Sequence, residues 1–303
     1  MNATLDCIPC LLRQAVRSAR LVSRDPAVQE RMLRRVLERI SRMPLDVPAP
    51  RVGREVHATI REESGQPDPF REIKHQYTRF ALDLLPRLEA MVQNAHDPFE
   101  TAIRLAIAGN IIDFGSELEL TQDLVETTLA DVLQRPLAIN DLEALRAAVA
   151  GAADILYLAD NAGELVFDRL LLGQLAEKDV TLVVKGGPII NDATLDDARE
   201  AGIDSLVRVI TNGSDVPGTI PEMCSPDFRR RFQAASLVIA KGQGNFETLS
   251  RERRRIFYLL KVKCQVVASL LGCRLGDLVV MDNRRANRPD YDGMTHPHTT
   301  ASR

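Results

Sequence analysis

The sequence predicts a three-layer α/β/α, Rossmann-like core built on a parallel sheet, joined to a helical N-terminal region. The first half carries apolar residues at helical spacing and no confident strand, whereas the second half alternates short apolar runs with helical patterns. Buried strands that alternate with helices are typical of a parallel sheet covered on both faces. We therefore expect a helical region at 1–150, an α/β core at 151–284 and a disordered tail at 285–303, which is polar and lacks periodicity.

The first half is expected to consist of helices and one proline-marked connection at 43–53. Pro98 suits the first turn of one of these helices. The segments with helical spacing are 11–19, 28–40, 68–85, 97–115, 120–134 and 140–150.

The second half is expected to supply every strand of the sheet. Short, continuous apolar runs bounded by polar residues or glycines stand at 154–160, 180–186, 206–211, 236–242, 255–260 and 278–283. Helical patterns lie between most of them, at 164–177, 194–202, 227–235 and 262–272.

The composition narrows the class of protein. Of 303 residues, 45% are hydrophobic and 27% charged, which is typical of a soluble globular protein. The net charge of −3 argues against a nucleic-acid partner, and no uncharged apolar run is long enough to cross a membrane. The odd number of cysteines and the lack of a secretion signal favour the reducing cytoplasm. The sequence predicts no oligomeric state.

Polar side chains and glycines follow each of the first four predicted strands. They are Asp160, Asn161 and Glu164 after the first, Lys185, Asn191 and Asp192 after the second, Asn212, Ser214 and Asp215 after the third, and Lys241, Asn245 and Glu247 after the fourth. Because ligands of open α/β sheets bind beyond the carboxyl ends of the strands, we expect one site there. Carboxylate and amide oxygens suit Mg²⁺ or Mn²⁺, while lysines and glycine-rich turns suit phosphate. A divalent cation beside lysines indicates hydrolysis of a phosphoryl group.

Two of these segments have other interpretations. Asp160 and Asn161 could simply cap the helix that starts near Glu164. The segment GQGNFE (242–247) is no dinucleotide fingerprint, because Glu247 stands at the last glycine position. A haloacid-dehalogenase-like phosphatase would carry a second Asp two residues after the first, where this chain has Ala162. Asp160 is therefore interpreted as a metal ligand and not as a phosphorylated nucleophile.

These segments carry a resemblance to a known family. The chain resembles the domain of unknown function 89 family, which is described as metal-dependent damage-control phosphatases, and is most similar to its prokaryotic branch with an N-terminal cysteine pair. The matching segments span residue 7 to about residue 284 and are CIPCLLRQ, DPFREIK, AIAGNIIDFG, DNAGELVFD, VVKGGPIINDAT, GSDVPG, KGQGNFE and LLKVKC.

The resemblance implies an activity and a set of site residues. The activity is hydrolysis of phosphate monoesters of small metabolites, such as sugar phosphates or damaged phosphometabolites, with Mn²⁺, Co²⁺, Ni²⁺ or Mg²⁺. The implied metal ligands are Asp160, Asn161 and Asp192, and the implied phosphate ligand is Lys241. We add the pocket residues Lys185, Asn110, Asp113 and Asn245. Asp160 is the main expected catalytic residue, with Glu164 or Asp215 as the base.

The cysteine pair allows two interpretations. Cys7 and Cys10 form a C-x-x-C at the start of a helix, which suits half of a thiolate metal site or a redox pair. No second C-x-x-C exists, so Cys264, which the resemblance also covers, is the candidate third ligand. The alternative, which we favour slightly, is inert buried thiols at a helix contact.

Other functions remain as alternatives to a metal-dependent phosphatase that acts on a small phosphorylated metabolite. One is a regulator that binds a phosphometabolite or nucleotide in the same pocket without turnover. Another is a methyltransferase, which would want a glycine-rich loop after the first strand and an acid at the end of the second, where Lys185 stands. A thiol-based redox protein is the least favoured.

Overall fold

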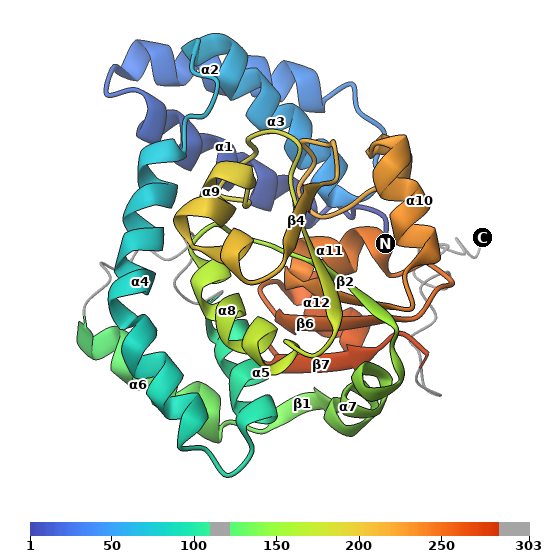
Figure 1. The fold of residues 1–303 in the computed structure, drawn as a ribbon. Coiled ribbons are helices and arrows are strands. Elements are labelled where there is room, and N and C mark those ends of the chain that lie inside the picture. The colour runs from blue at the N-terminus through green and yellow to red at the C-terminus, as the bar shows by residue number, and fades with distance from the viewer. Residues whose placement is uncertain (110–121, 285–303) are drawn as a thin grey trace, which may run out of the picture.

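The computed structural model describes residues 1–109 and 122–284 of the chain. In this part a seven-stranded sheet, ordered β1-β7-β6-β5-β2-β3-β4, lies between helices, and α1–α3 form a separate group beside it (Figure 1). The strands are β1 (Leu137–Asn140), β2 (Asp154–Leu158), β3 (Asp179–Val184), β4 (Arg208–Thr211), β5 (Leu237–Lys241), β6 (Ile256–Lys261) and β7 (Leu278–Asp282). The helices are α1 (Cys7–Val22), α2 (Pro26–Ile40), α3 (Ala49–Ser64), α4 (Arg71–Gln93), α5 (Pro98–Ala108), α6 (Gln122–Gln134), α7 (Leu142–Gly151), α8 (Glu164–Gln174), α9 (Leu195–Glu200), α10 (Pro226–Ala234), α11 (Gly242–Leu249) and α12 (Gln265–Leu271).

The α/β class is confirmed, but the sheet is not wholly parallel. Strands β2 to β6 are parallel to their neighbours, whereas β7 pairs with β6 antiparallel and β1 pairs with β7 parallel. Two strands at one side therefore run against the other five. The predicted parallel sheet is confirmed for five strands, and the sequence did not show the opposite direction of β1 and β7, because a strand buried on both faces has a continuous apolar run whichever way it points.

Strand β1 is a second difference from the prediction, which placed no strand before residue 150. It has only four residues, and only Leu137 and Ile139 of these are buried. This alternation of buried and exposed residues is too short to stand out between the helical patterns of α6 and α7. Pairing with β7 is what makes the segment a strand.

The core of the α/β part has two sides because successive side chains of a strand point to opposite faces of the sheet. Tyr157 and Leu182 pack on the side of α5 and α8. Leu156 and Val238 pack on the side of α10, α11 and α12, with Phe246 of α11. The strands are thereby fixed in register, and the carboxyl ends of the five parallel strands, β2 to β6, meet at one edge.

The first three helices have their own core, which includes Leu11, Val36 and Val56. Helix α3 begins at Ala49, inside the segment that was predicted to be a proline-marked connection. Pro50 lies in its first turn, where the missing N–H costs no hydrogen bond. The proline thus starts a helix here and does not mark the end of structure.

Ion pairs join the N-terminal helices to the α/β core. Lys74 of α4 is buried, and its Nζ lies 2.8 Å from Asp68 Oδ2 and 3.0 Å from Asp197 Oδ2. Asp197 also closes the capping box at the start of α9. This contact fixes α4 against the core. It gives a structural role to Asp68 and Lys74, two charged residues of the segment DPFREIK.

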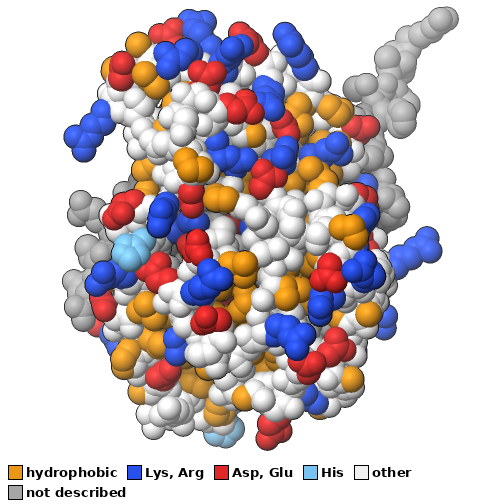
Figure 2. Space-filling view, turned by 45° about the horizontal axis from the view of Figure 1, so that its top comes forward, with side chains coloured by type: hydrophobic (Ala, Val, Ile, Leu, Met, Phe, Trp, Pro, Cys, Tyr) orange, Lys and Arg blue, Asp and Glu red, His pale blue; other side chains and the backbone are white. Residues whose placement is uncertain are grey.

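The surface mixes charges of both signs. Lys and Arg side chains are interspersed with Asp and Glu on the face that Figure 2 shows. Exposed pairs within single helices, such as Arg34–Glu30 and Arg230–Asp227, have the same mixed character. No helix among the described residues is long and apolar enough to cross a membrane.

Candidate metal and phosphate site

The acid and amide after β2 lie at the carboxyl edge of the sheet, next to the start of α8. Gly163, and neither Asp160 nor Asn161, is the N-cap residue of α8. The amide Nδ2 of Asn161 donates to Glu164 Oε1 at 2.5 Å and to Asp160 Oδ2 at 3.4 Å. The simple capping interpretation therefore does not account for the pair.

The loop after β3 folds back onto this segment and brings a second carboxylate to it. An isolated bridge joins Asn161 to Asp192, and Ala193 N–H donates to the carbonyl of Asp160 at 2.8 Å. Ile190 in this loop has φ +45°, a conformation that β-branched residues rarely adopt. Such strain persists where surrounding contacts enforce the conformation. The strained residue lies two positions before Asp192, in the turn that brings this carboxylate to the site. The sequence could not show this fold-back, because it depends on pairing between distant segments.

Helix α11 closes the site from another side. The segment GQGNFE, expected as a polar strand end, is this helix, and its first residue Gly242 has φ +77°. A Cβ at Gly242 would lie 1.9 Å from Asp160 Oδ2, so only glycine leaves room for the carboxylate. Asp160 therefore lies against a helix N-terminus, which favours negative charge.

Lys241 is buried in a network of acids behind the site. Its Nζ lies 2.6 Å from Asp168 Oδ1 and 3.3 Å from Glu164 Oε2, and Tyr157 Oη donates to Asp168 Oδ1 at 2.7 Å. Burial alone would lower the pKa of Lys241, but the charges of Asp168 and Glu164 raise it. Burial raises the pKa of Glu164 to about 8, with Asp160 adding to the shift and Lys241 opposing it. With that pKa, Glu164 is mostly protonated at pH 7.

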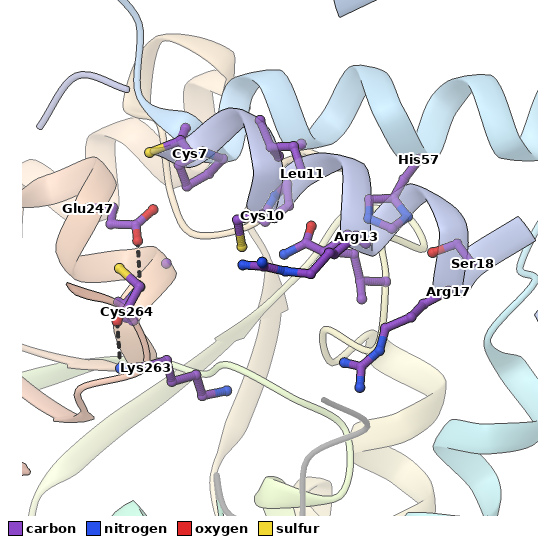
Figure 3. A pocket seen from close by; sticks show the side chains of 18 of the residues that line it. Cys7, Cys10, Leu11, Arg13, Arg17, Ser18, His57, Glu247, Lys263 and Cys264 are labelled. Carbon is purple, nitrogen blue, oxygen red and sulfur yellow. Dashed lines mark hydrogen bonds between the residues drawn. The ribbon is translucent and has the colours of Figure 1, made fainter. Parts of the chain in front are cut away.

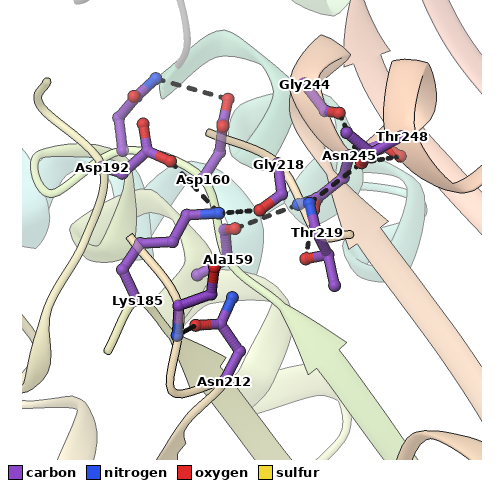
Figure 4. A network of polar contacts seen from close by, with 12 residues as sticks. Ala159, Asp160, Lys185, Asp192, Asn212, Gly218, Thr219, Gly244, Asn245 and Thr248 are labelled. Carbon is purple, nitrogen blue, oxygen red and sulfur yellow. Dashed lines mark hydrogen bonds and ion pairs between the residues drawn. The ribbon is translucent and has the colours of Figure 1, made fainter. Parts of the chain in front are cut away.

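Lys185 and Asn245 also make contacts within the protein (Figure 4). Lys185 Nζ lies 3.3 Å from Asp192 Oδ2 and donates to the carbonyl of Gly218. Asn245 donates to the carbonyls of Ala159 and Lys241 and accepts from Thr219 Oγ1 at 2.8 Å. Lys185 positions a proposed metal ligand, and Asn245 clamps the ends of β2 and β5. Neither lines the cavity described below, so their contact with phosphate stays a prediction.

Asp215 does not line the cavity described below and is held by two arginines. Arg54 Nε contacts its Oδ1 at 2.6 Å and Arg61 Nη2 contacts its Oδ2 at 2.8 Å. Burial alone would raise the pKa of Asp215, but the hydrogen bonds and charges of the two arginines lower it. A carboxylate held in this way ties α3 to the loop after β4 and is a weak base. Asn110 and Asp113 lie outside the described residues.

A cavity of about 880 Å³ opens between the strand ends and α1 (Figure 3). The three residues implied as metal ligands, Asp160, Asn161 and Asp192, all line it. Glu247 of α11 lines it too, and burial raises the pKa of this carboxyl to about 7. The helical region therefore supplies one wall of the site and is not a separate attachment.

Residues that the sequence did not single out also line the cavity. Arg13 and Arg17 of α1, Lys263 after β6 and His57 of α3 are among them. Arg13 stands in the segment CIPCLLRQ and Lys263 in LLKVKC, so the matching segments contained the signal. Without the tertiary structure, nothing placed either segment beside the strand ends.

The three candidate thiolate ligands lie on this same cavity. Cys7, Cys10 and Cys264 are half-buried and form no disulfide. Burial raises the pKa of the Cys10 and Cys264 thiols. Within residues 1–109 and 122–284, no group of three or more His, Cys, Asp or Glu is arranged to hold a metal ion. The thiolate site stays a prediction.

The donor chemistry at the strand ends fits a hard divalent cation. Asp160 and Asp192 supply carboxylate oxygens, and Asn161 supplies an amide oxygen because its Nδ2 is directed to Glu164. Oxygen donors of this kind suit Mg²⁺ and Mn²⁺. Backbone contacts hold the two segments that carry these carboxylates side by side, and a cation bound by both would offset their negative charges.

Fold and site together define a class of α/β proteins that carry a carboxylate–amide site at the carboxyl ends of parallel strands. The model of the damage-control phosphatase ARMT1-like domain matches residues 3–279, and the chain belongs to this family. The resemblance seen in the sequence is thereby confirmed at the level of the family.

Relatives match along nearly their whole length. A damage-control phosphatase from Archaeoglobus fulgidus is 34% identical over 285 residues, which cover 90% of this chain and 96% of the relative. A damage-control phosphatase from Pyrococcus horikoshii is 34% identical over 292 residues, which cover 94% of this chain and 99% of the relative. The crystal structure of a DUF89 family protein from Pyrococcus horikoshii matches with a TM-score of 0.86 at 32% identity, over 94% of this chain and 100% of that one.

Proposed function

We propose that this protein is a metal-dependent phosphatase that hydrolyses phosphate monoesters of small metabolites. The observation that carries the proposal is the assembly of Asp160, Asn161 and Asp192 on one cavity wall by the fold-back after β3. Family membership and the names of the relatives support the phosphatase part of this proposal.

In this proposal Asp160, Asn161 and Asp192 hold a divalent cation. Such a cation would draw charge from the phosphoryl group and favour ionisation of a water molecule. Lys185 keeps Asp192 in place, and Gly242 leaves room for the carboxylate of Asp160. The cavity takes the organic part of the substrate, and its volume is that of a small-molecule site.

Of the two expected bases, Glu164 is the better placed, although a pKa of about 8 makes it a proton donor near neutral pH and a base only at higher pH. It contacts Asn161 directly, whereas Asp215 is held by two arginines. Glu247 is a further candidate for proton transfer, because it lines the cavity with a pKa of about 7.

The test is a phosphatase screen over phosphorylated sugars and cofactors, repeated with Mn²⁺, Co²⁺, Ni²⁺ and Mg²⁺. We expect D160N to lower kcat by about 100-fold or more, because it removes a charged ligand while keeping the side-chain shape. Metal affinity, measured by calorimetry, falls with it. D204N, at an exposed aspartate far along the chain, is the matched control.

Two outcomes would count against the proposal. Retained turnover and metal binding in folded D160N would overturn the ligand assignment. A folded wild type that hydrolyses nothing with any metal would favour the regulator that binds a phosphometabolite without turnover.

A further inference from the structure

Four buried polar side chains form a connected chain of contacts behind the proposed metal site. Tyr157 Oη donates to Asp168 Oδ1 at 2.7 Å, and Lys241 Nζ lies 2.6 Å from the same oxygen and 3.3 Å from Glu164 Oε2. The other oxygen of Glu164, Oε1, accepts from Asn161 Nδ2 at 2.5 Å. The chain therefore runs from β2 to a proposed metal ligand. We call Tyr157, Asp168, Lys241 and Glu164 the buried chain.

The buried chain is fixed in position by three elements of the core. Glu164 and Asp168 are four residues apart on α8, so they lie on the same face of this helix. Lys241, the last residue of β5, contacts both of them. None of the four side chains is more than 2% exposed. An unpaired buried charge is strongly destabilising, so each of these charges stays with its partner.

The direction of the hydrogen bonds in the buried chain fixes the amide of Asn161. An ammonium group has donors only, so Glu164 Oε2 must accept from Lys241. Oε1 of the same carboxylate accepts from Asn161, which directs the amide Nδ2 to Glu164 and leaves Oδ1 available to a cation. A hard cation binds the amide oxygen and not the nitrogen. The orientation of this amide therefore decides whether Asn161 is a metal ligand.

The location of Glu164 separates this role from that of a base. A general base needs an oxygen within reach of a water molecule in the cavity. Asn161 is among the described residues that line the cavity and Glu164 is not. Both oxygens of Glu164 are directed to protein donors, Asn161 and Lys241. Glu164 thus meets the cavity through Asn161.

We propose that Glu164, held by Lys241 and Asp168, is a positioning residue of the metal site that turns the amide oxygen of Asn161 to the cation. This inference rests on the proposed metal-dependent function and deepens it by assigning a role to residues behind the site. The competing role for Glu164 is that of the general base.

The variant E164Q tests the proposal because it keeps the shape of the side chain and changes one acceptor into a donor. Lys241 can only donate, so it takes the oxygen of the new amide, and the new Nε2 faces Asn161. The amide of Asn161 must then turn and present Nδ2 to the cation. We expect Mg²⁺ affinity, measured by calorimetry without substrate, to fall about tenfold. The titration is made at about pH 9, where Glu164 of the wild type is ionised.

The N161D background separates the orientation of the amide from the charge of Glu164. A carboxylate at this position has no amide to turn, and it accepts from the Nε2 that E164Q introduces while its second oxygen faces the cation. We therefore expect E164Q to lower Mg²⁺ affinity in the wild-type background and not in the N161D background. An equal fall in both backgrounds would mean that the cation senses only the charge of Glu164, and would overturn the proposal.

A second variant keeps the charge and changes the reach. In E164D the carboxylate is one methylene shorter and cannot contact both Asn161 and Lys241, so Mg²⁺ affinity should fall although the charge is unchanged. E177Q is the matched control, because Glu177 is exposed and lies just beyond the end of α8. Its Mg²⁺ affinity should equal that of the wild type, and thermal unfolding confirms that each variant is folded. Wild-type affinity in folded E164D would also contradict the proposal.

The competing role and failure of the proposed function give different results. Unchanged Mg²⁺ affinity in E164Q together with a lower kcat assigns Glu164 to the base and overturns the proposal. A wild type that binds neither Mg²⁺ nor Mn²⁺ removes the proposed metal site, and the role of Glu164 with it. A wild type that binds Mg²⁺ and hydrolyses no phosphate ester contradicts only the phosphatase assignment, because the affinities of E164Q in the two backgrounds still decide the role of Glu164.

Discussion

At the scale of single residues, the candidate site depends on how Asp160 is surrounded. Its backbone carbonyl is held by Ala193 and its carboxylate lies against Gly242. The identity of Asp160 suggested a metal ligand, but its orientation depends on partners that lie far along the chain.

Gly242 provides a residue-scale prediction. In G242A the new Cβ would overlap the carboxylate of Asp160, and φ +77° would be strained, at a cost of about 1–3 kcal/mol. We expect Mn²⁺ affinity and phosphatase activity to fall by tenfold or more, roughly the free-energy cost of displacing one ligand. Calorimetry and a steady-state assay measure the two effects.

G151A is the control, since a Cβ at Gly151 meets nothing within 4 Å. Wild-type metal affinity in G242A would show that the close approach of α11 to Asp160 has no role in the site.

At the scale of elements, the packing of first-half helices against the sheet determines which side chains line the cavity. Helix α1 forms a wall of the cavity, and α3 contributes His57 to it. Helix α4 is fixed to α9 by the buried Lys74, which contacts Asp68 and Asp197.

Lys74 gives a prediction at this scale. K74M leaves two carboxylates near each other without their cation, and breaking a buried pair in this way costs about 3–5 kcal/mol. Denaturant unfolding should show a decrease of that size in the free energy of unfolding. R79M, which removes an exposed cation from the same helix, is the control.

A set of variants tests whether the loss of stability in K74M arises from the unpaired charge of the two acids. Neutralising the acids as well, in K74M/D68N/D197N, should recover part of the stability. No recovery would mean that packing of the lysine side chain, and not charge, is what matters.

At the scale of the whole molecule, one buried histidine makes stability depend on pH. His57 is 3% exposed, and neither ring nitrogen has a hydrogen-bond partner among the described residues. Burial, followed by the charge of Arg61, lowers the pKa of His57 to about 3. Its ordinary pKa is about 6.5, so between these two values the unfolded chain binds more protons than the folded chain.

We therefore expect the free energy of unfolding to fall as the pH drops below about 6.5, by up to about 1.4 kcal/mol per pH unit from this group. Urea unfolding over a pH series measures the slope. H57L should flatten it, whereas H96L, at an exposed histidine, is the control. An identical slope in H57L and the wild type would assign the acid sensitivity to other groups.

The sequence by itself determined the α/β class, most of the elements and the chemical identity of the strand ends. Apolar runs flanked by Asp, Asn, Lys and Gly are local signals, so β2, β3 and β5 and the residues after them could be found. The matching segments also identified the family.

Only the tertiary structure decided which of these polar residues face a cavity. Asp160, Asn161 and Asp192 do, whereas Lys185 and Lys241 turn to buried acids. It also set the antiparallel pairing of β6 with β7 and placed Arg13 and Arg17 beside the strand ends. The physical reason is that the direction and partners of a side chain come from contacts between segments far apart in the chain, which leave no periodic trace in the sequence.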